Sequence, residues 1–154
     1  MDDDVQQIAD VCQERDLHVA VAESLTSGSV ASLLGAGPEA ADWFLGGVVA
    51  YGERVKYDVL GVTPGPLVTE RCAQEMARGV ARLLGADATI GITGIGGPEP
   101  SEGKPSGTVV IAVQAGRLEH SRMYRFPGNP ETVIAATAHR AVGSLAEVLR
   151  SLPR

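Results

Sequence analysis

Apolar and polar positions follow two different periods along the chain. In some stretches apolar residues recur at the spacing of one helix face, and elsewhere they form short runs typical of strands. The helical spacing predicts helices over residues 2–15, 30–34, 53–60, 70–84 and 131–152. The apolar runs and one hairpin pattern predict strands over residues 18–22, 45–51, 87–93, 107–115 and 118–126.

The order of these elements predicts the fold class. Helices and strands alternate early in the chain, whereas the last two strands form a hairpin around Gly116 and Arg117. Alternation favours a sheet covered by helices on both faces, and the hairpin adds antiparallel pairing. We therefore expect an α/β fold, a three-layer α/β/α sandwich around a mixed, mostly parallel sheet. The chain length predicts a single domain over residues 1–154.

Composition and charge narrow the possible functions. The formal charge of −6 argues against nonspecific binding of nucleic acid and against an anionic membrane surface. No apolar run approaches the length of a membrane span, and the acidic N-terminus lacks the pattern of a signal peptide. Cys12, Cys72 and three dispersed histidines make no recognisable metal site. We expect a cytoplasmic protein with reduced thiols and no metal.

The turn after the first predicted strand carries the strongest chemical signal. An apolar run ends at Glu23 and Ser24, small residues follow, and a helical pattern begins. At such a turn a side-chain oxygen lies at the carboxyl edge of the sheet, beside free N–H groups of the helix. Ser24 is therefore a candidate nucleophile. The alternative is that Ser24, Thr26 and Ser27 only cap the helix.

Two known motifs, the phosphate-binding P-loop and the nucleophile elbow, are only partly matched by this sequence. A phosphate-binding P-loop needs four residues between its glycines and a helix after its lysine. Here five residues separate Gly97 from Gly103, and Pro105 follows Lys104. The glycines that flank a nucleophile-elbow serine are absent around Ser24. His139 lies within the last predicted helix, where a surface or core-edge position is the commoner interpretation.

A second group of residues follows the glycine-containing strand. Tyr51 ends that strand, and Lys56 lies about one helical turn further on. If this strand neighbours the first one, both residues meet Ser24 at one sheet edge, where α/β sheets bind ligands. A lysine can accept the serine proton when burial lowers its pKa, and a tyrosine hydroxyl between them can relay it. The alternative is a strand-end tyrosine and an exposed helical lysine.

Three segments together resemble the C-terminal domain of the CinA (competence-damage-inducible) family. They are residues 22–28 (AESLTSG), 44–62 (FLGGVVAYGERVKYDVLGV) and 93–109 (TGIGGPEPSEGKPSGTV). Stand-alone members of this family are nicotinamide mononucleotide deamidases. The resemblance implies hydrolysis of the nicotinamide carboxamide to the acid with release of ammonia, and no metal or organic cofactor. It implies a small-molecule nucleotide as the partner.

The resemblance also implies which residues form the site. The Ser–Tyr–Lys catalytic group of the family falls on Ser24, Tyr51 and Lys56. Residues in the same segments are expected to bind substrate through side chains or backbone N–H groups. These are Glu23, Thr26, Ser27, Gly28, Gly47, Thr93, Gly94, Gly97 and Lys104. The glycine-rich strand at residues 45–50 and the apolar helices lead us to expect a homodimer.

The chain also departs from the family pattern. Ser27 replaces a glycine, Asn129 and Pro130 replace Asp-Arg, and Ile134 replaces an arginine of the last helix. These changes favour a second hypothesis, a non-catalytic pyridine-nucleotide-binding module that has lost full deamidase activity. A third is an interaction domain related to the fused CinA proteins.

Overall fold

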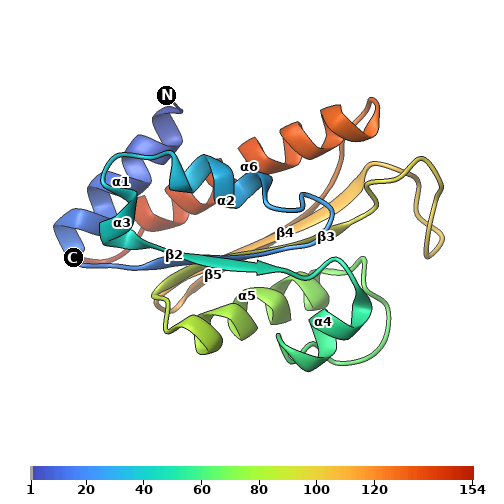
Figure 1. Ribbon diagram of the computed structural model, residues 1–154, viewed down its shortest axis with the longest axis horizontal. Coiled ribbons are helices and arrows are strands. Elements are labelled where there is room, and N and C mark those ends of the chain that lie inside the picture. Colours follow the sequence, from blue (N-terminus) through green and yellow to red (C-terminus); the bar gives the residue numbers. More distant parts are fainter. Residues whose placement is uncertain (1) are drawn as a thin grey trace.

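The computed structural model describes residues 2–154 and contains helices and strands in alternation, followed by a hairpin and a long helix (Figure 1). In chain order the elements are α1 (Asp3–Arg15), β1 (Val19–Glu23), α2 (Ser29–Gly35), α3 (Ala40–Trp43), β2 (Phe44–Val49), α4 (Glu53–Asp58), α5 (Glu70–Leu84), β3 (Ala88–Gly94), β4 (Thr108–Ala115), β5 (Leu118–Arg125) and α6 (Pro130–Arg150).

The strands form one sheet in the order β2-β1-β3-β4-β5. β1 pairs in parallel with β2 and β3, whereas β3–β4 and β4–β5 are antiparallel. Four of the five strands therefore run in the same direction, although the pairings divide evenly between parallel and antiparallel. The α/β class and the mixed sheet agree with the sequence prediction.

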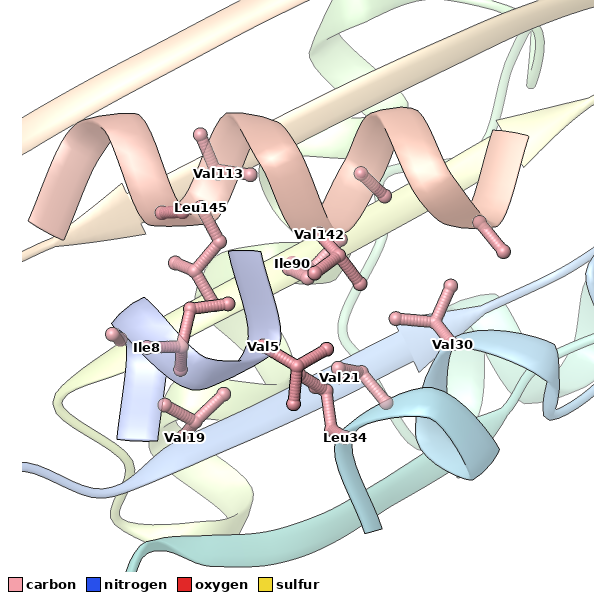
Figure 2. Packing of buried hydrophobic residues seen from close by; sticks show 14 of the residues in the cluster. Val5, Ile8, Val19, Val21, Val30, Leu34, Ile90, Val113, Val142 and Leu145 are labelled. Carbon is pink, nitrogen blue, oxygen red and sulfur yellow. The ribbon is translucent and has the colours of Figure 1, made fainter. Parts of the chain in front are cut away.

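Helices cover both faces of the sheet, which gives the expected three layers (Figure 1). α1, α2, α3 and α6 lie on one face, and α4 and α5 lie on the other. The larger core cluster joins helices α1, α2 and α6 to alternate strand residues (Figure 2). Val5 and Ile8 of α1 and Val142 and Leu145 of α6 are fully or almost fully buried there. The core is therefore mostly aliphatic and consists mainly of Val, Leu, Ile and Ala.

Helix ends explain several polar residues of the sequence. The Thr69 hydroxyl accepts a hydrogen bond from Cys72 N, and the left-handed Gly85 (φ +69°) ends α5. At the start of α6 the Asn129 side chain accepts from Thr132 N, with Pro130 in the first turn. The departures at Asn129 and Pro130 therefore supply a favourable start for this helix.

The prediction missed one short element. α3 lies before β2, in a segment where the sequence pattern predicted no helix. Its Trp43 is buried, and its indole N–H donates to the Pro38 carbonyl oxygen at 2.8 Å. A four-residue helix is too short to show an apolar period, so no pattern could have marked it.

Candidate functional site

Ser24 and Lys56 are in direct contact at the carboxyl edge of the sheet. The Lys56 Nζ atom lies 3.0 Å from Ser24 Oγ, 2.7 Å from the Ala50 carbonyl oxygen and 3.4 Å from the Tyr51 carbonyl oxygen. Both side chains are buried, with exposed fractions of 6% for Ser24 and 3% for Lys56. The pair thus forms the centre of the candidate site.

The strand register brings these two residues together. β1 and β2 pair in parallel with Glu23 opposite Val49, so the residues that follow the strands emerge side by side. Ala50 N donates to the Glu23 carbonyl oxygen and extends this pairing by one residue. The chain turns at Gly52 into α4, and Lys56 is the buried residue of that helix. The ammonium group therefore reaches back to the end of β1.

The surroundings of Lys56 favour its neutral form. Burial lowers the pKa of Lys56 from its ordinary value of 10.5, while the nearby Cys72 and Glu53 oppose the shift. A neutral amine has two N–H donors and one lone pair. As an ammonium group, Lys56 donates to Ser24 Oγ and to the two carbonyl oxygens. Once it has lost a proton, two N–H groups remain for the Ala50 and Tyr51 carbonyl oxygens, and its lone pair can accept the Ser24 hydroxyl proton. The arrangement is that of a general base beside a hydroxyl nucleophile.

Glu23 supports the turn and does not face the cleft. Its two carboxylate oxygens accept hydrogen bonds from Val30 N at 2.9 Å and Ala31 N at 3.0 Å, and its side chain is fully buried. These N–H groups belong to the first turn of α2 and have no partner within that helix. Glu23 thus ties the end of β1 to α2 and holds the intervening Ser24 in place.

A cleft of about 310 Å³ opens above the Ser24–Lys56 pair. Its lining comes from the ends of β1, β2 and β3, the start of α4 and two loops. The lining residues are Ser24, Leu25, Tyr51, Glu53, Lys56, Leu67, Val68, Thr93, Gly94, Ile95, Gly96, Gly97, Ser101 and Glu102.

Two loops contribute to the lining of the cleft: residues 59–69, which precede α5, and residues 95–107, which join β3 to β4. The Glu102 carboxylate accepts hydrogen bonds from the backbone N–H groups of Leu67 and Val68 and so joins these loops. The Thr93 hydroxyl donates to the Leu67 carbonyl oxygen at 3.0 Å. The wall therefore rests on contacts between residues 26 and 35 positions apart in the sequence.

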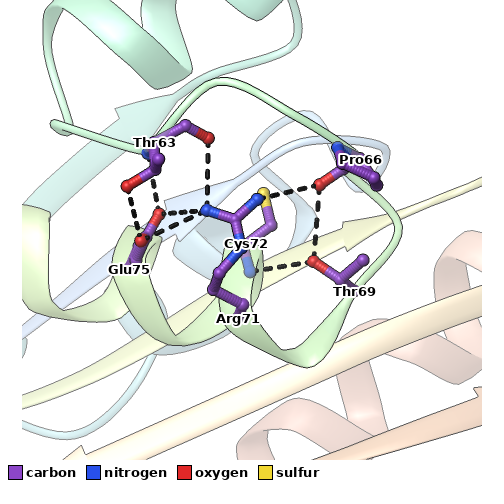
Figure 3. Close-up of polar contacts among 6 residues, drawn as sticks. All are labelled: Thr63, Pro66, Thr69, Arg71, Cys72 and Glu75. Carbon is purple, nitrogen blue, oxygen red and sulfur yellow. Dashed lines mark hydrogen bonds and ion pairs between the residues drawn. The ribbon is translucent and has the colours of Figure 1, made fainter.

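An ion pair on α5 holds the loop that precedes this helix (Figure 3). Arg71 lies 3.2 Å from Glu75 and donates to the carbonyl oxygens of Thr63 and Pro66. Burial alone would raise the pKa of Glu75, but hydrogen bonds from Thr63 and the Arg71 charge outweigh it and lower that pKa. The loop is thereby fixed to the helix at several points.

Several predicted site residues line the cleft, and the others lie outside it. Ser24, Tyr51, Lys56, Thr93, Gly94 and Gly97 are in the lining. The residues outside the lining are Glu23, Thr26, Ser27, Gly28, Gly47 and Lys104.

Tyr51 takes a different position from the one predicted. A hydroxyl between Ser24 and Lys56 was expected, but these two side chains touch directly. The Tyr51 side chain is 69% exposed at the cleft, and its carbonyl oxygen is the group that contacts Lys56. In the described part of the chain its hydroxyl makes no hydrogen bond with either residue.

The small residues outside the lining have structural surroundings. A Cβ atom at Gly47 would lie 2.2 Å from the Val21 carbonyl oxygen, so the glycine permits close approach of β2 to β1. Ser27 is exposed in the left-handed conformation (φ +48°), and its hydroxyl donates to the Ser24 and Leu25 carbonyl oxygens. Lys104 pairs through its backbone with Ser101.

Thr26 lies two residues after Ser24 in the sequence, and its buried hydroxyl lacks a hydrogen-bond partner in the described chain. Its Oγ1 atom has no hydrogen-bond partner within residues 2–154, although its side chain is only 1% exposed. Buried hydroxyls normally find a partner, so a small polar group or water is the expected neighbour.

Eight residues of the lining were not among the predicted site residues: Leu25, Glu53, Leu67, Val68, Ile95, Gly96, Ser101 and Glu102. Glu53 is visible only as an acidic residue in the first turn of a helix, which suits any helix dipole. Leu67 and Val68 precede a helix cap and carry no chemical signal. Glu102 lies in a loop of small and polar residues, and nothing local points to its distant partners.

The cysteines and histidines of the described chain are not part of the cleft lining. Over residues 2–154 no group of three or more His, Cys, Asp and Glu side chains is arranged to hold a metal ion. Cys12 and Cys72 are free and buried, and burial raises the pKa of both thiols. His139 is exposed and lies 3.1 Å from Asp2. Among the helices described, none combines the length and the apolar character that crossing a membrane requires.

Comparison with known proteins gives a consistent assignment. The model of the CinA C-terminal domain matches residues 2–149. A putative competence-damage inducible protein of Desulforamulus reducens is 38% identical over 142 residues, which cover 89% of this chain and 34% of that protein. A CinA-like protein of Thermotoga maritima is 37% identical, over 92% of this chain and 36% of its own length. The chain thus spans about a third of these relatives.

Solved structures match over nearly their whole length. The crystal structure of a CinA superfamily protein from Klebsiella pneumoniae superposes with a TM-score of 0.91 at 33% identity, and the match covers 97% of this chain and 98% of that one. The protein CihA of Agrobacterium tumefaciens gives a TM-score of 0.87 at 29% identity, with 96% and 94% covered. The chain belongs to the CinA C-terminal domain family.

Proposed function

We propose that this protein is an amidohydrolase that converts nicotinamide mononucleotide to nicotinate mononucleotide and ammonia. The observation that carries the proposal is the contact of 3.0 Å between Lys56 Nζ and Ser24 Oγ at the floor of a cleft. A buried lysine with a lowered pKa is a suitable base for a serine nucleophile. Membership of the CinA family adds support through the resemblance described above.

The reaction proceeds through an acyl-enzyme. Ser24 Oγ attacks the carboxamide carbon while Lys56 takes the hydroxyl proton. The tetrahedral intermediate then collapses, the bond between the carbon and the amide nitrogen breaks, and Lys56 returns the proton to the departing ammonia. A water molecule, deprotonated by the same lysine, then attacks the ester carbon. The bond between this carbon and Ser24 Oγ breaks, and Lys56 returns the proton to Oγ as the acid leaves. The reaction consumes one water and needs no redox partner.

Backbone N–H groups near Ser24 are suited to hold the oxyanion. Leu25, Gly96 and Gly97 line the cleft, and within the described residues their N–H groups donate to no protein acceptor. Oxyanion donors of this kind typically contribute about 100- to 1000-fold to the rate. We assign the oxyanion to this region of the cleft.

Tyr51 completes the proposed group in two ways. Its carbonyl oxygen orients the Lys56 amine, and its exposed ring lies at the cleft, where it covers the bound nicotinamide. Because the carbonyl remains in Tyr51→Phe, that variant should keep most activity, whereas Tyr51→Ala should raise the KM.

A homodimer stays a prediction. β2 is an edge strand without charged residues, and its Leu45 and Val49 are exposed. Substitution of these two residues tests whether the dimer forms through this strand.

The test is release of ammonia from nicotinamide mononucleotide by the purified protein. We expect steady turnover that falls at least about 100-fold in Ser24→Ala. Ser32→Ala, an exposed serine of α2 outside the cleft, is the matched control and should behave as the unaltered protein. Full activity in Ser24→Ala would overturn the nucleophile assignment. Saturable binding without turnover would instead favour a non-catalytic nucleotide-binding module.

A further inference from the structure

A groove lies between β5 and α6, apart from the cleft. Its volume is about 610 Å³, and it shares no lining residue with the cleft. Side chains of a strand alternate between the two faces of a sheet. On β5, Glu119 and Ser121 hydrogen-bond to side chains of α5. His120, Arg122 and Tyr124 take the alternate positions and line the groove on the α6 side.

The packing of α6 leaves this space open. β5 is the edge strand next to β4. Val142 and Leu145 of α6 belong to the same core cluster as Ile111 and Val113 of β4. The helix therefore packs over β4, and its polar residues, among them Arg140, form the wall of the groove that faces β5.

Two arginines of the groove share one aromatic ring. The Cζ atoms of Arg122 on β5 and Arg140 on α6 lie 5.3 Å and 5.4 Å from the centre of the Tyr124 ring. Tyr124 in turn stacks on Phe126, with 5.5 Å between the ring centres and 8° between the planes. Because a guanidinium group is attracted to an aromatic ring, Tyr124 positions both cations in the groove.

Neither guanidinium group is neutralised by a carboxylate of residues 2–154. The arginines that form ion pairs in this part of the chain are Arg54, Arg71 and Arg78. A guanidinium group that lies over a ring keeps N–H groups along its edge, where they can donate to a ligand. Arg122 and Arg140 carry like charges near one ring and repel each other. An anion that binds both removes this repulsion.

The other groups of the groove favour a small ligand. Asp4 and Glu147 also line it, and the chain has a formal charge of −6, so a polyanion such as nucleic acid is repelled. The volume of the groove is in the range of small-molecule sites. A phosphate monoester carries about two negative charges and three acceptor oxygens, which suit two guanidinium groups, whereas a single guanidinium group can pair with a carboxylate.

We propose that the groove between β5 and α6 binds the terminal phosphate group of a small molecule. Arg122 and Arg140 donate to the phosphate oxygens, and Tyr124 positions the two guanidinium groups. The group comes either from inorganic phosphate or from a phosphate monoester such as a sugar phosphate. This site is independent of the proposed amidase reaction.

The test is titration of the full chain with inorganic phosphate and with ribose 5-phosphate, with ribose as the control ligand. Calorimetry measures the affinity, and the NMR signals of the arginine Nε–H groups locate the site. We expect saturable binding of a phosphate compound that moves the signals of Arg122 and Arg140, and no binding of ribose. Tighter binding of ribose 5-phosphate identifies a monoester as the ligand, and otherwise the ligand is the free ion.

Substitutions separate a built site from general surface charge. Arg122→Gln and Arg140→Gln should each weaken binding about tenfold or more. Tyr124→Leu keeps both charges but removes the ring that positions them, so it should weaken binding by about two- to fivefold. Arg125→Gln is the matched control, because Arg125 is an exposed residue of the same strand outside the groove. It should bind like the unaltered protein.

Four results would overturn the inference. The first is the absence of saturable binding by both phosphate compounds. The second is binding that leaves the Arg122 and Arg140 signals in place, since the ligand then lies elsewhere, for example in the cleft. The third is an equal loss of affinity in Arg122→Gln and Arg125→Gln, or no loss in Tyr124→Leu. The fourth is tighter binding of single-stranded RNA than of either phosphate compound. Because ammonia release is not part of this test, each of these results leaves the amidase proposal intact.

Discussion

Lys56 Nζ lies 3.0 Å from Ser24 Oγ, although 32 positions separate these residues in the sequence. Parallel pairing of β1 and β2 brings the two strand ends together, and one turn of α4 returns the lysine to the first strand. The position of the base is therefore set by the sheet register and by the length of the segment between Ala50 and Lys56. A one-residue change in that segment would remove the contact.

Substitution of Lys56 separates its chemical role from its structural one. Lys56→Met keeps the side-chain length and removes the base, so we expect a loss of at least about 100-fold in kcat. In the unaltered protein kcat/KM should rise with pH through the lowered pKa of Lys56, because only the neutral amine accepts the serine proton. A pH profile of ammonia release checks this expectation, and a flat profile would contradict the base assignment.

The same lowered pKa predicts how stability depends on pH. Between the folded-state pKa of Lys56 and its ordinary value of 10.5, the unfolded chain holds a proton that the folded chain has released. The contribution of Lys56 to the free energy of unfolding therefore rises with pH across this window. Compared with Lys56→Met, the unaltered protein should gain relative stability as the pH approaches 10.5. Urea unfolding at several pH values measures the difference, and a gap that stays constant would argue against a buried, desolvated amine.

Glu23 should act through stability before it acts through binding. Its carboxylate satisfies Val30 N and Ala31 N, so Glu23→Ala leaves two helix donors without a partner. We expect a loss of about 2–3 kcal/mol in the free energy of unfolding, and a smaller loss in Glu23→Gln, which keeps one acceptor oxygen. Glu14→Gln on the exposed face of α1 serves as the control. If Glu23→Ala unfolds like the unaltered protein but shows a raised KM, Glu23 has the substrate-binding role that the resemblance implied.

The sequence predicted elements better than contacts between distant loops. Ser24 and Lys56 became candidates because an apolar run shows where each strand ends, and strand ends of an α/β sheet gather at one edge. The resemblance to the CinA family then favoured them over a helix cap and an exposed lysine. The role of Glu23 stayed hidden because its carboxylate reaches a helix turn seven residues later. Glu102 stayed hidden because its partners are 34 and 35 residues away.

Local patterns also leave the direction of a side chain undetermined. Tyr51 was predicted to end the strand, but β2 ends at Val49 and Tyr51 follows it by two residues. Whether its hydroxyl or its carbonyl meets Lys56 depends on backbone torsion angles around Gly52. Gly47 was predicted to bind substrate, at a position where a strand glycine indicates close approach of either another backbone or a ligand. The atom that approaches is the carbonyl oxygen of Val21 on β1. A glycine in a strand indicates that another group lies close to its Cα atom, but only the tertiary structure shows whether that group is a ligand or a neighbouring backbone.

Two glycines allow the fold and the cleft to be tested separately. A Cβ at Gly47 would lie 2.2 Å from the Val21 carbonyl oxygen, so Gly47→Ala should cost about 2–3 kcal/mol of stability. At Gly97 a Cβ meets nothing within 4 Å, and Gly97→Ala should change stability by less than about 0.5 kcal/mol. Because Gly97 lines the cleft, its added methyl should still lower kcat/KM by about tenfold or more. Unchanged activity in Gly97→Ala would place the substrate away from this loop.

Glu102 joins the two loops that form one wall of the cleft, and its removal should loosen that wall without unfolding the protein. In Glu102→Ala the N–H groups of Leu67 and Val68 lose their carboxylate acceptor. Hydrogen bonds to a charged group are worth about 1.5–3 kcal/mol, so hydrogen exchange at these two amides should accelerate by about 10- to 100-fold. The KM should rise, since the wall no longer holds its shape. Glu99→Ala, an exposed glutamate of the same loop, should leave both measurements unchanged. Exchange at unaltered rates in Glu102→Ala would mean that other contacts, such as the Thr93 hydroxyl on the Leu67 carbonyl oxygen, are sufficient to hold the wall.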